Sequence, residues 1–212
     1  MESTCRKSVY VLVLCGPERE RWINPELAGF LISLTQPEAQ QRFRFGIGFL
    51  QAAPIEKARN ISVANFLESG AQWFLSLDND AVPPPNFLDF ISAAVRDGKT
   101  LAVPQFHSNN LPQVLRHRPV LVWRREKDAQ ESDGWVELTG AGGHCILAHR
   151  RVLQSIQPPW FATELSADGR ELVCAEDFYF FYKARAAGFP LYGNTRFSVG
   201  HYKSVDISSL AI

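Results

Sequence analysis

Short apolar runs alternate with segments of helical periodicity through the first half of this chain. The first run, Ser8–Leu14, is almost continuously aliphatic or β-branched, which is typical of a strand covered on both faces. Further strands are predicted at Phe43–Phe49, Trp73–Leu77 and Thr100–Val103. Helices are predicted between them at Pro25–Leu34, from Pro54 to Gly70 and from Asn86 to Gly98. This alternation predicts a parallel sheet with helices on both faces.

The pattern changes after Pro104. Gln105–Arg118 is polar and predicts a long loop, of the kind that often carries function. A hairpin of two strands, Pro119–Trp123 and Trp135–Leu138, would form a small antiparallel element in the C-terminal half. The elements predicted after it are a strand at His144–Ala148, a helix that starts near His149, a helix that ends at Gly188 and a strand within Arg196–Lys203. We therefore expect one α/β domain, 1–212, with a seam near residue 104 between its two halves.

Composition narrows the class of protein. The chain has 212 residues, of which 46% are hydrophobic, enough for one good core. Its 22 basic and 22 acidic residues cancel, so the charge does not point to nucleic acid or to an anionic membrane surface. No apolar run is long enough to span a bilayer, and the run from Val9 lacks the cleavage site of a signal peptide. The four cysteines lie far apart without a C-x-x-C pair, which favours reduced thiols and predicts a cytoplasmic protein.

The candidate chemistry begins at Asp78-Asn79-Asp80, directly after the buried run Trp73–Leu77. In open α/β sheets ligands bind at the carboxyl ends of strands, and carboxylate oxygens suit a hard divalent cation. Asp and Asn are also common in solvated turns, so the motif alone fits a turn or a metal site. Acids one residue apart on an extended chain point in opposite directions, so we expect at most one of them to bind metal.

Four further groups have both a structural and a chemical interpretation. Glu176-Asp177 starts a helix, where the macrodipole favours acids, but either acid could be a general base. Gly140–Gly143 is a turn or a place where the backbone approaches a ligand, and it is neither a P-loop nor a dinucleotide fingerprint. His201 is a structural residue or a ligand. Arg59 and Lys203 are surface cations or contacts to phosphate.

The order of these motifs resembles that of the nucleotide-sugar glycosyltransferases with the GT-A fold. The segments that carry the resemblance are Ala58-Arg59-Asn60, Phe74–Asp80 with the prolines after it, Thr139–Leu147, Pro159–Phe161, Ala175–Phe178 and Val199–His201. The resemblance implies a single Rossmann-like GT-A domain with a mostly parallel central sheet, helices on both faces and a small antiparallel element in the C-terminal half. In such a domain residues 1–103 would form the nucleotide-binding half and residues 104–212 the acceptor and catalytic half. It also implies transfer of a sugar from a UDP- or GDP-sugar to a glycan or other hydroxyl acceptor, with inversion.

The resemblance implies roles for individual residues. Asp80 and His201 would bind Mn²⁺ or Mg²⁺, which bridges the donor diphosphate. Asp78, with Asn79 beside it, would contact the ribose or the sugar. Asp177 would deprotonate the acceptor, with Glu176 as the second candidate. The other positions implied for substrate binding are Arg59, Gly142, Gly143, Lys203 and Trp160, and Trp160 fits a core tryptophan equally well.

The chain departs from the common inverting family in two places. Cys15-Gly-Pro17-Glu18 stands where that family has Pro-x-Tyr-Asn, and Gly46-Ile-Gly48 replaces an acidic cluster, so the nucleobase contacts are undefined. The motif Gln-x-x-Arg-Trp is absent, which argues against a processive polysaccharide synthase. Two alternatives stay open. One is a nucleotidyltransferase, which should carry a glycine- and basic-rich loop after its first strand, and the other is a non-catalytic GT-A-like binding module.

Overall fold

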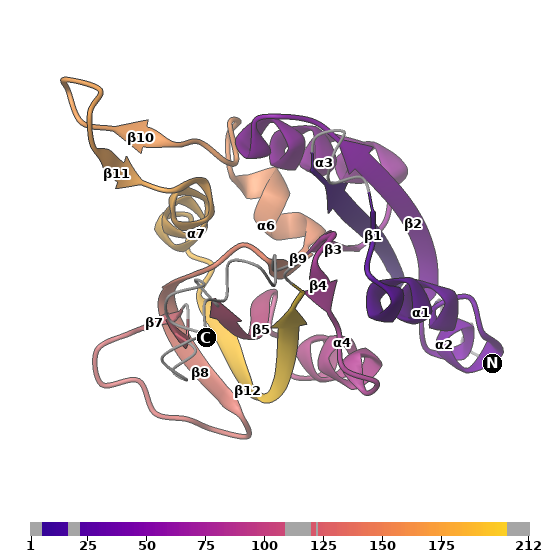
Figure 1. The fold of residues 1–212 in the computed structure, drawn as a ribbon. Coiled ribbons are helices and arrows are strands. Elements are labelled where there is room, and N and C mark those ends of the chain that lie inside the picture. The colour runs from indigo at the N-terminus through magenta and orange to yellow at the C-terminus, as the bar shows by residue number, and fades with distance from the viewer. Residues whose placement is uncertain (1–5, 17–21, 109–119, 122, 203–212) are drawn as a thin grey trace, which may run out of the picture.

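A mixed sheet of ten strands forms the centre of the computed structural model, which describes residues 6–16, 22–108, 120–121 and 123–202 (Figure 1). A separate two-stranded hairpin, β10–β11, projects from the domain. The strands are β1 (Ser8–Cys15), β2 (Arg44–Gln51), β3 (Trp73–Asp78), β4 (Ala81–Val82), β5 (Leu101–Ser108), β6 (Val120–Leu121), β7 (Trp123–Arg125), β8 (Trp135–Ala141), β9 (Cys145–His149), β10 (Glu164–Leu165), β11 (Leu172–Cys174) and β12 (Leu191–His201). The helices are α1 (Pro25–Ser33), α2 (Pro37–Arg42), α3 (Ile55–Ser69), α4 (Phe87–Arg96), α6 (Arg150–Ser155) and α7 (Glu176–Ala186).

The strand order in the main sheet is β2-β1-β3-β9-β5-β12-β8-β7, with β4 paired to β12 and β6 to β5. β1 runs parallel to β2 and β3, and β5 runs parallel to β12. β9 is antiparallel to both of its neighbours, and β8 is antiparallel to β12 and β7. The predicted α/β fold with an antiparallel element in the C-terminal half is confirmed. The sheet is mixed rather than mostly parallel, because β9, β8, β4 and β6 each pair antiparallel with their neighbours. The sequence pattern does not locate β9 between β3 and β5.

Alternation along the central strands gives each face of the sheet its own core. Val11 and Val13 of β1 pack in the core with α1 and α4, whereas Leu12 and Leu14 pack in the core with α3, α6 and α7. Figure 1 shows these two groups of helices on opposite sides of the sheet. All four side chains are buried, which explains why the run is apolar without interruption.

Two predicted segments can be compared directly with the structure. The loop prediction for Gln105–Arg118 is wrong in its first part, because β5 continues to Ser108. There Phe106 pairs with Val199 of β12, and this distant partner has no signal in the local pattern. Residues 109–119 lie outside the described part of the chain. The predicted hairpin of Pro119–Trp123 with Trp135–Leu138 is correct only in part. Val120–Leu121 (β6) pairs with β5, and the strand that pairs with β8 is β7, which begins at Trp123, the last residue of the predicted strand.

The ends of the helices follow local chemistry. Asn24 caps α1, and its side-chain oxygen accepts a hydrogen bond from the N–H of Leu27 at 2.7 Å. Gly70 ends α3 with a φ of 72°, a left-handed conformation that glycine adopts without strain. Asn86 precedes α4 as predicted, but its side chain makes no capping hydrogen bond. Among the described helices, none combines the length and apolar character needed to cross a membrane.

Candidate active site

Asp78 is the last residue of β3, a central strand, and so lies at the carboxyl end of that strand. The antiparallel register of β3 and β9 places Leu77 opposite Cys145, so the residue before β9, His144, comes next to Asp78. The Asp78 amide donates a hydrogen bond to the His144 carbonyl oxygen at 3.0 Å. The start of an antiparallel strand therefore meets the carboxyl end of β3, where ligands bind in open α/β sheets.

The end of β12 brings His201 to the same place. β12 pairs with β4 so that His201 lies opposite Ala81, one residue after Asp80. The amide of Tyr202 donates to the carbonyl oxygen of Asp80 at 2.7 Å, which fixes the backbone of the turn. Nε2 of His201 lies 2.6 Å from Oδ2 of Asp80. Its Nδ1 is buried and has no hydrogen-bond partner within the described part of the chain.

His144 completes this cluster, and sequence reasoning missed it. Its side chain is 4% exposed and stacks on Phe106, with 4.2 Å between the ring centres. Nε2 lies 3.1 Å from the carbonyl oxygen of Gly200, and since a carbonyl oxygen only accepts, Nε2 carries the hydrogen. In the neutral ring Nδ1 then presents a lone pair. It faces Oδ1 of Asp80 at 3.4 Å and Oδ2 of Asp78 at 3.6 Å.

Asp80, His144 and His201 form a possible metal-binding triad. Each offers one ligand atom, and these atoms lie within 4.8 Å of one another. One carboxylate and two imidazoles make a donor set that divalent transition-metal ions accept. The position of Nδ1 fits the same interpretation. Its lone pair and the carboxylates of Asp78 and Asp80 repel one another, and a cation bound between them would attract all three groups. The triad contains both predicted ligands, Asp80 and His201.

Arg59 of α3 lies between the acids of β3 and those of α7. Its side chain is 4% exposed, its Nη2 lies 3.3 Å from the Asp78 carboxylate, and its Nε lies 3.3 Å from Oε1 of Glu176. Burial acts to lower the pKa of Arg59, but Asp78, Glu176 and Asp177 together raise it above its usual value. Nη1 is buried without a hydrogen-bond partner among the described residues. Arg59 is therefore not a surface cation, and its contact with a donor diphosphate remains a prediction.

Glu176 and Asp177 open α7 beside Arg59. Asp177 accepts hydrogen bonds from the N–H of Gly143 at 2.9 Å and from the N–H of Phe178 at 2.7 Å. Burial raises the pKa of Asp177, and the two amides and Arg59 oppose that shift. Burial also raises the pKa of Glu176, again opposed by Arg59. A carboxylate with a raised pKa is a stronger proton acceptor near neutral pH than an ordinary one.

Glycines allow this close packing. A Cβ on Gly143 would lie 3.0 Å from Nη2 of Arg59 and 3.0 Å from the Cβ of Asp177. A Cβ on Gly140 would lie 2.5 Å from the ring of Phe178. The Gly140–Gly143 run therefore lets side chains of α3 and α7 approach the backbone before β9. Donor contacts at Gly142 and Gly143 remain predictions.

The other predicted substrate-binding residues lie around this cluster. Asn79 donates from its side chain to the Trp22 carbonyl oxygen at 2.8 Å, which ties the segment before α1 to the acid motif. Trp160 is partly buried, and its indole N–H donates to the Leu153 carbonyl oxygen at 2.8 Å. These contacts are those of a packed tryptophan, and a role as an acceptor floor remains a prediction. Lys203 lies outside the described residues.

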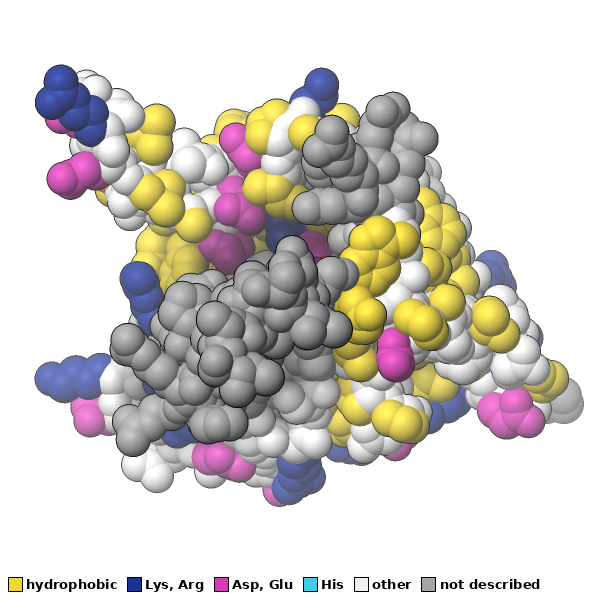
Figure 2. Space-filling model, viewed as in Figure 1, with side chains coloured by type: hydrophobic (Ala, Val, Ile, Leu, Met, Phe, Trp, Pro, Cys, Tyr) yellow, Lys and Arg dark blue, Asp and Glu magenta, His cyan; other side chains and the backbone are white. Residues whose placement is uncertain are grey.

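A cavity of about 240 Å³ opens beside the acids, outside the carboxyl ends of β1, β2 and β3. Its lining includes Cys15, Gly16, Ala52, Ala53, Ile55 and the Asp78–Asp80 stretch. On the face shown in Figure 2, acidic and basic side chains gather in a hollow near the base of the projecting hairpin. The cavity therefore combines small apolar walls with an acidic end, at the position where open α/β sheets bind ligands.

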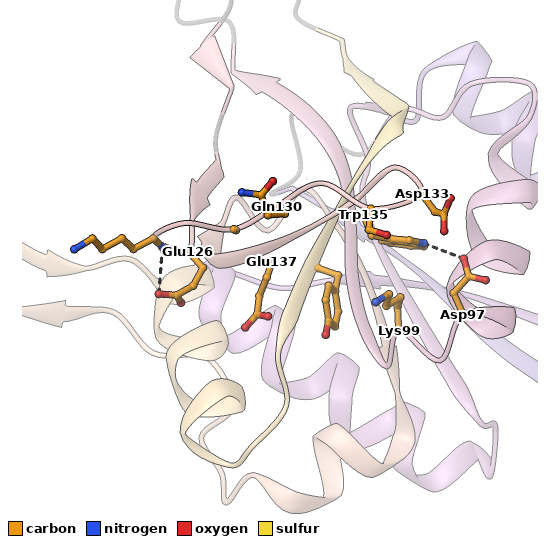
Figure 3. Close-up of a pocket in the computed structure, with 11 residues that line it drawn as sticks. Asp97, Lys99, Glu126, Gln130, Asp133, Trp135 and Glu137 are labelled. Carbon is orange, nitrogen blue, oxygen red and sulfur yellow. Dashed lines mark hydrogen bonds between the residues drawn. The ribbon is translucent and has the colours of Figure 1, made fainter.

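A larger cavity, of about 520 Å³, contains none of the predicted site residues (Figure 3). It lies at the starts of β8 and β12. Polar groups that line it already have partners: the indole N–H of Trp135 donates to Asp97 at 2.9 Å, and Nζ of Lys99 lies 3.8 Å from the centre of the Tyr192 ring. We therefore place the candidate site at the Asp78–Asp80 end of the sheet.

Comparisons with known proteins bear on the fold. A scan against protein-family models and a search of curated proteins find no match. Among solved structures, the chain is similar to A197 from STIV, with a TM-score of 0.61 and 20% identity over 93% of this chain and 86% of that chain. It is also similar to GalNAc-T7 with UDP, GalNAc and Mn²⁺, with a TM-score of 0.51 and 11% identity over 96% of this chain and 45% of that chain. UDP-glucose pyrophosphorylase complexed with UDP-glucose aligns with a TM-score of only 0.47 and 12% identity, over 95% and 77% of the two chains.

These similarities define a class by fold. The chain has a GT-A-like α/β fold with a mixed central sheet, similar to the folds of A197 and GalNAc-T7. Identities of 20% and below establish the fold alone. The choice between sugar transfer and nucleotidyl transfer therefore depends on the chemistry of the site.

Proposed function

We propose that this chain is a metal-dependent glycosyltransferase that moves a sugar from a nucleotide diphosphate sugar to a hydroxyl acceptor, with inversion. The observation that carries the proposal is the Gly143-His144 dipeptide. The Gly143 amide holds the carboxylate of Asp177, and the next side chain, His144, faces the acids of the Asp78–Asp80 motif. A candidate base and a candidate cation site are thus adjacent, and displacement of a diphosphate by a hydroxyl needs both.

The site residues divide into a donor side and an acceptor side. Asp80 and His201 would bind a divalent cation, Mn²⁺ or Mg²⁺, which neutralises charge on the leaving diphosphate. Asp78, held by Arg59, would contact the ribose or the sugar. Asp177 would take the proton of the acceptor hydroxyl. The amides of Gly143 and Phe178 hold its carboxylate in place, and the lone pairs that these two hydrogen bonds leave unused can accept the proton. Glu176 is the second candidate for this role, and a UDP- or GDP-sugar is the donor.

The buried base favours a hydroxyl acceptor over the nucleotidyltransferase alternative. A sugar phosphate that attacks a nucleoside triphosphate is largely ionised at neutral pH, because the second pKa of a phosphate monoester is about 6. Such a nucleophile needs no base. A hydroxyl must lose its proton during attack, and a carboxylate whose pKa is raised by burial suits that task.

The proposal is tested by incubating the full chain with UDP- and GDP-sugars and MnCl₂ or MgCl₂, and measuring release of nucleoside diphosphate. We expect metal-dependent release that Asp177→Asn lowers by about 10²–10⁴-fold. Asp89→Asn, a change on the exposed surface of α4, should leave it unchanged. Absence of both release and donor binding would contradict the proposal. Pyrophosphate release from nucleoside triphosphate and sugar phosphate would identify the nucleotidyltransferase, and donor binding without turnover would identify a binding module.

A further inference from the structure

The geometry of His144 points to how the cation is held. We propose that His144 is a third protein ligand beside Asp80 and His201, so that the chain binds a cation of the Mn²⁺ and Co²⁺ type with no nucleotide present. This inference rests on the proposed function in one respect only: the substrate that later binds to the cation would be a nucleotide diphosphate sugar.

His144 has the surroundings of an oriented metal ligand. A histidine that binds metal through one ring nitrogen generally donates the other N–H to a carbonyl or carboxylate oxygen, which fixes the tautomer and the ring plane. Here the Nε2–H is directed to the Gly200 carbonyl oxygen at 3.1 Å, and the ring is held flat against Phe106. The orientation therefore leaves Nδ1 directed at Asp80 and Asp78.

The three ligands come from three separate parts of the sheet, and each is anchored by its own pairing. Asp80 follows β3, His144 precedes β9, and His201 ends β12. The β3–β9 and β4–β12 registers bring them together without any contribution from a ligand. Since the ligand atoms already lie within 4.8 Å of one another, little ordering is needed when a cation binds.

The donor set determines which cation should bind. Mg²⁺ and Ca²⁺ prefer oxygen ligands, whereas imidazole suits transition-metal ions. Two imidazoles and one carboxylate leave further positions of a six-coordinate ion open for diphosphate oxygens or water. Because the protein itself supplies three ligands, the ion needs no phosphate oxygen in order to stay bound. Mn²⁺ and Co²⁺ should therefore bind the nucleotide-free chain more tightly than Mg²⁺.

Calorimetric titration of the nucleotide-free full chain with MnCl₂ tests the inference. We expect one Mn²⁺ per chain, bound more than about 10-fold more weakly by His144→Ala, since even the loss of a supporting residue costs that much. His149→Ala, which changes the histidine at the other end of β9, should bind as the wild type does. In the unmodified chain, Mn²⁺ at less than one equivalent should broaden the NMR signals of His144 and His201 before those of His149. This second measurement does not depend on a variant that folds.

The results separate this inference from the proposed function. If Mn²⁺ binds only after UDP is added, or if His144→Ala binds Mn²⁺ as tightly as the wild type, the third-ligand assignment is wrong and sugar transfer can still stand. If Mn²⁺ binds alone and no sugar donor is turned over, the ligand assignment stands and the transferase proposal fails.

Discussion

At the scale of single residues, the environment of Asp177 sets a pH dependence. Burial raises its pKa, while the N–H groups of Phe178 and Gly143 and the guanidinium of Arg59 act in the opposite direction. A general base must be ionised, so kcat/KM should be high above this raised pKa and should fall as pH decreases through it. We expect the acidic limb of the profile to lie above the ordinary aspartate value of about 3.9, measured with one donor at saturating Mn²⁺.

Arg59 provides the control for this assignment. Arg59→Met removes a cation that lowers the pKa of Asp177, so the acidic limb should move to still higher pH. Arg44→Met, at an exposed position of β2, should leave the limb where it is. A profile that stays flat down to the ordinary aspartate range, or a limb that Arg59→Met does not move, would show that Asp177 is not the base.

Some residues of the site can be found from the sequence because each lies where an element begins or ends. Asp78 and Asp80 follow a buried run, and Asp177 opens a helix. His144 cannot be found in this way, although glycines precede it and a strand follows, because only the register of β9 against β3 shows which residues it faces. The buried ion pair of Arg59 cannot be predicted from the sequence either, because the periodicity of α3 does not show that Arg59 contacts Glu176, which lies 117 positions later in the chain.

At the scale of the elements, Arg150 joins the start of α6 to the end of α3. Its guanidinium donates to the carbonyl oxygens of Ala71, Leu67 and Phe66 at 2.6, 2.9 and 3.0 Å. Phe66 and Leu67 lie in the last turn of α3, where carbonyl oxygens have no backbone N–H partner within the helix. Arg150→Met should therefore lower the free energy of unfolding by about 2–4 kcal/mol, as measured by urea denaturation.

The next residue supplies a matched control for that change. Arg151 is exposed, so Arg151→Met should alter the free energy of unfolding by less than about 0.5 kcal/mol. Mn²⁺ binding should be the same in both variants, because neither residue belongs to the triad. Equal stability of the two variants would show that the Arg150 hydrogen bonds do not stabilise the junction of α3 and α6.

Elements with strong end signals could be predicted, and those defined by pairing could not. Asn24 and Pro25 mark the start of α1, and Gly70 marks the end of α3. The far end of β5 is polar in sequence and becomes a strand only because β12 lies beside it. Local propensity is a weak guide in such a segment, since a strand is stabilised by its neighbours.

At the scale of the whole molecule, the two sequence halves share one sheet. β9, from the second half, lies between β3 and β5 of the first half, and Leu147 pairs with both Leu75 and Ala102. A division of function near residue 104 remains a prediction. The change of composition there does not reveal that a later strand is inserted into the earlier part of the sheet, because that pairing is long-range.

We therefore expect neither half to fold alone. In fragment 1–108, which keeps β5 whole, β3 and β5 would lose the strand that joins them, and the backbone groups facing β9 would lose their partners. In fragment 109–212, the side chains of Ile146 and Leu147 would become exposed to solvent, whereas they are 1% and 0% exposed in the intact chain. Each fragment, made separately, should show no cooperative thermal transition by circular dichroism.

Mixing the two fragments should restore the transition, and it should also restore Mn²⁺ binding. The reason is that Asp80 lies in the first fragment while His144 and His201 lie in the second, so the triad exists only when β9 is inserted beside β3. The intact chain, unfolded and refolded under the same conditions, is the control. A fragment 1–108 that melts cooperatively by itself would show that β9 is an addition to a complete sheet, whereas we infer that it is the strand on which the sheet and the site both depend.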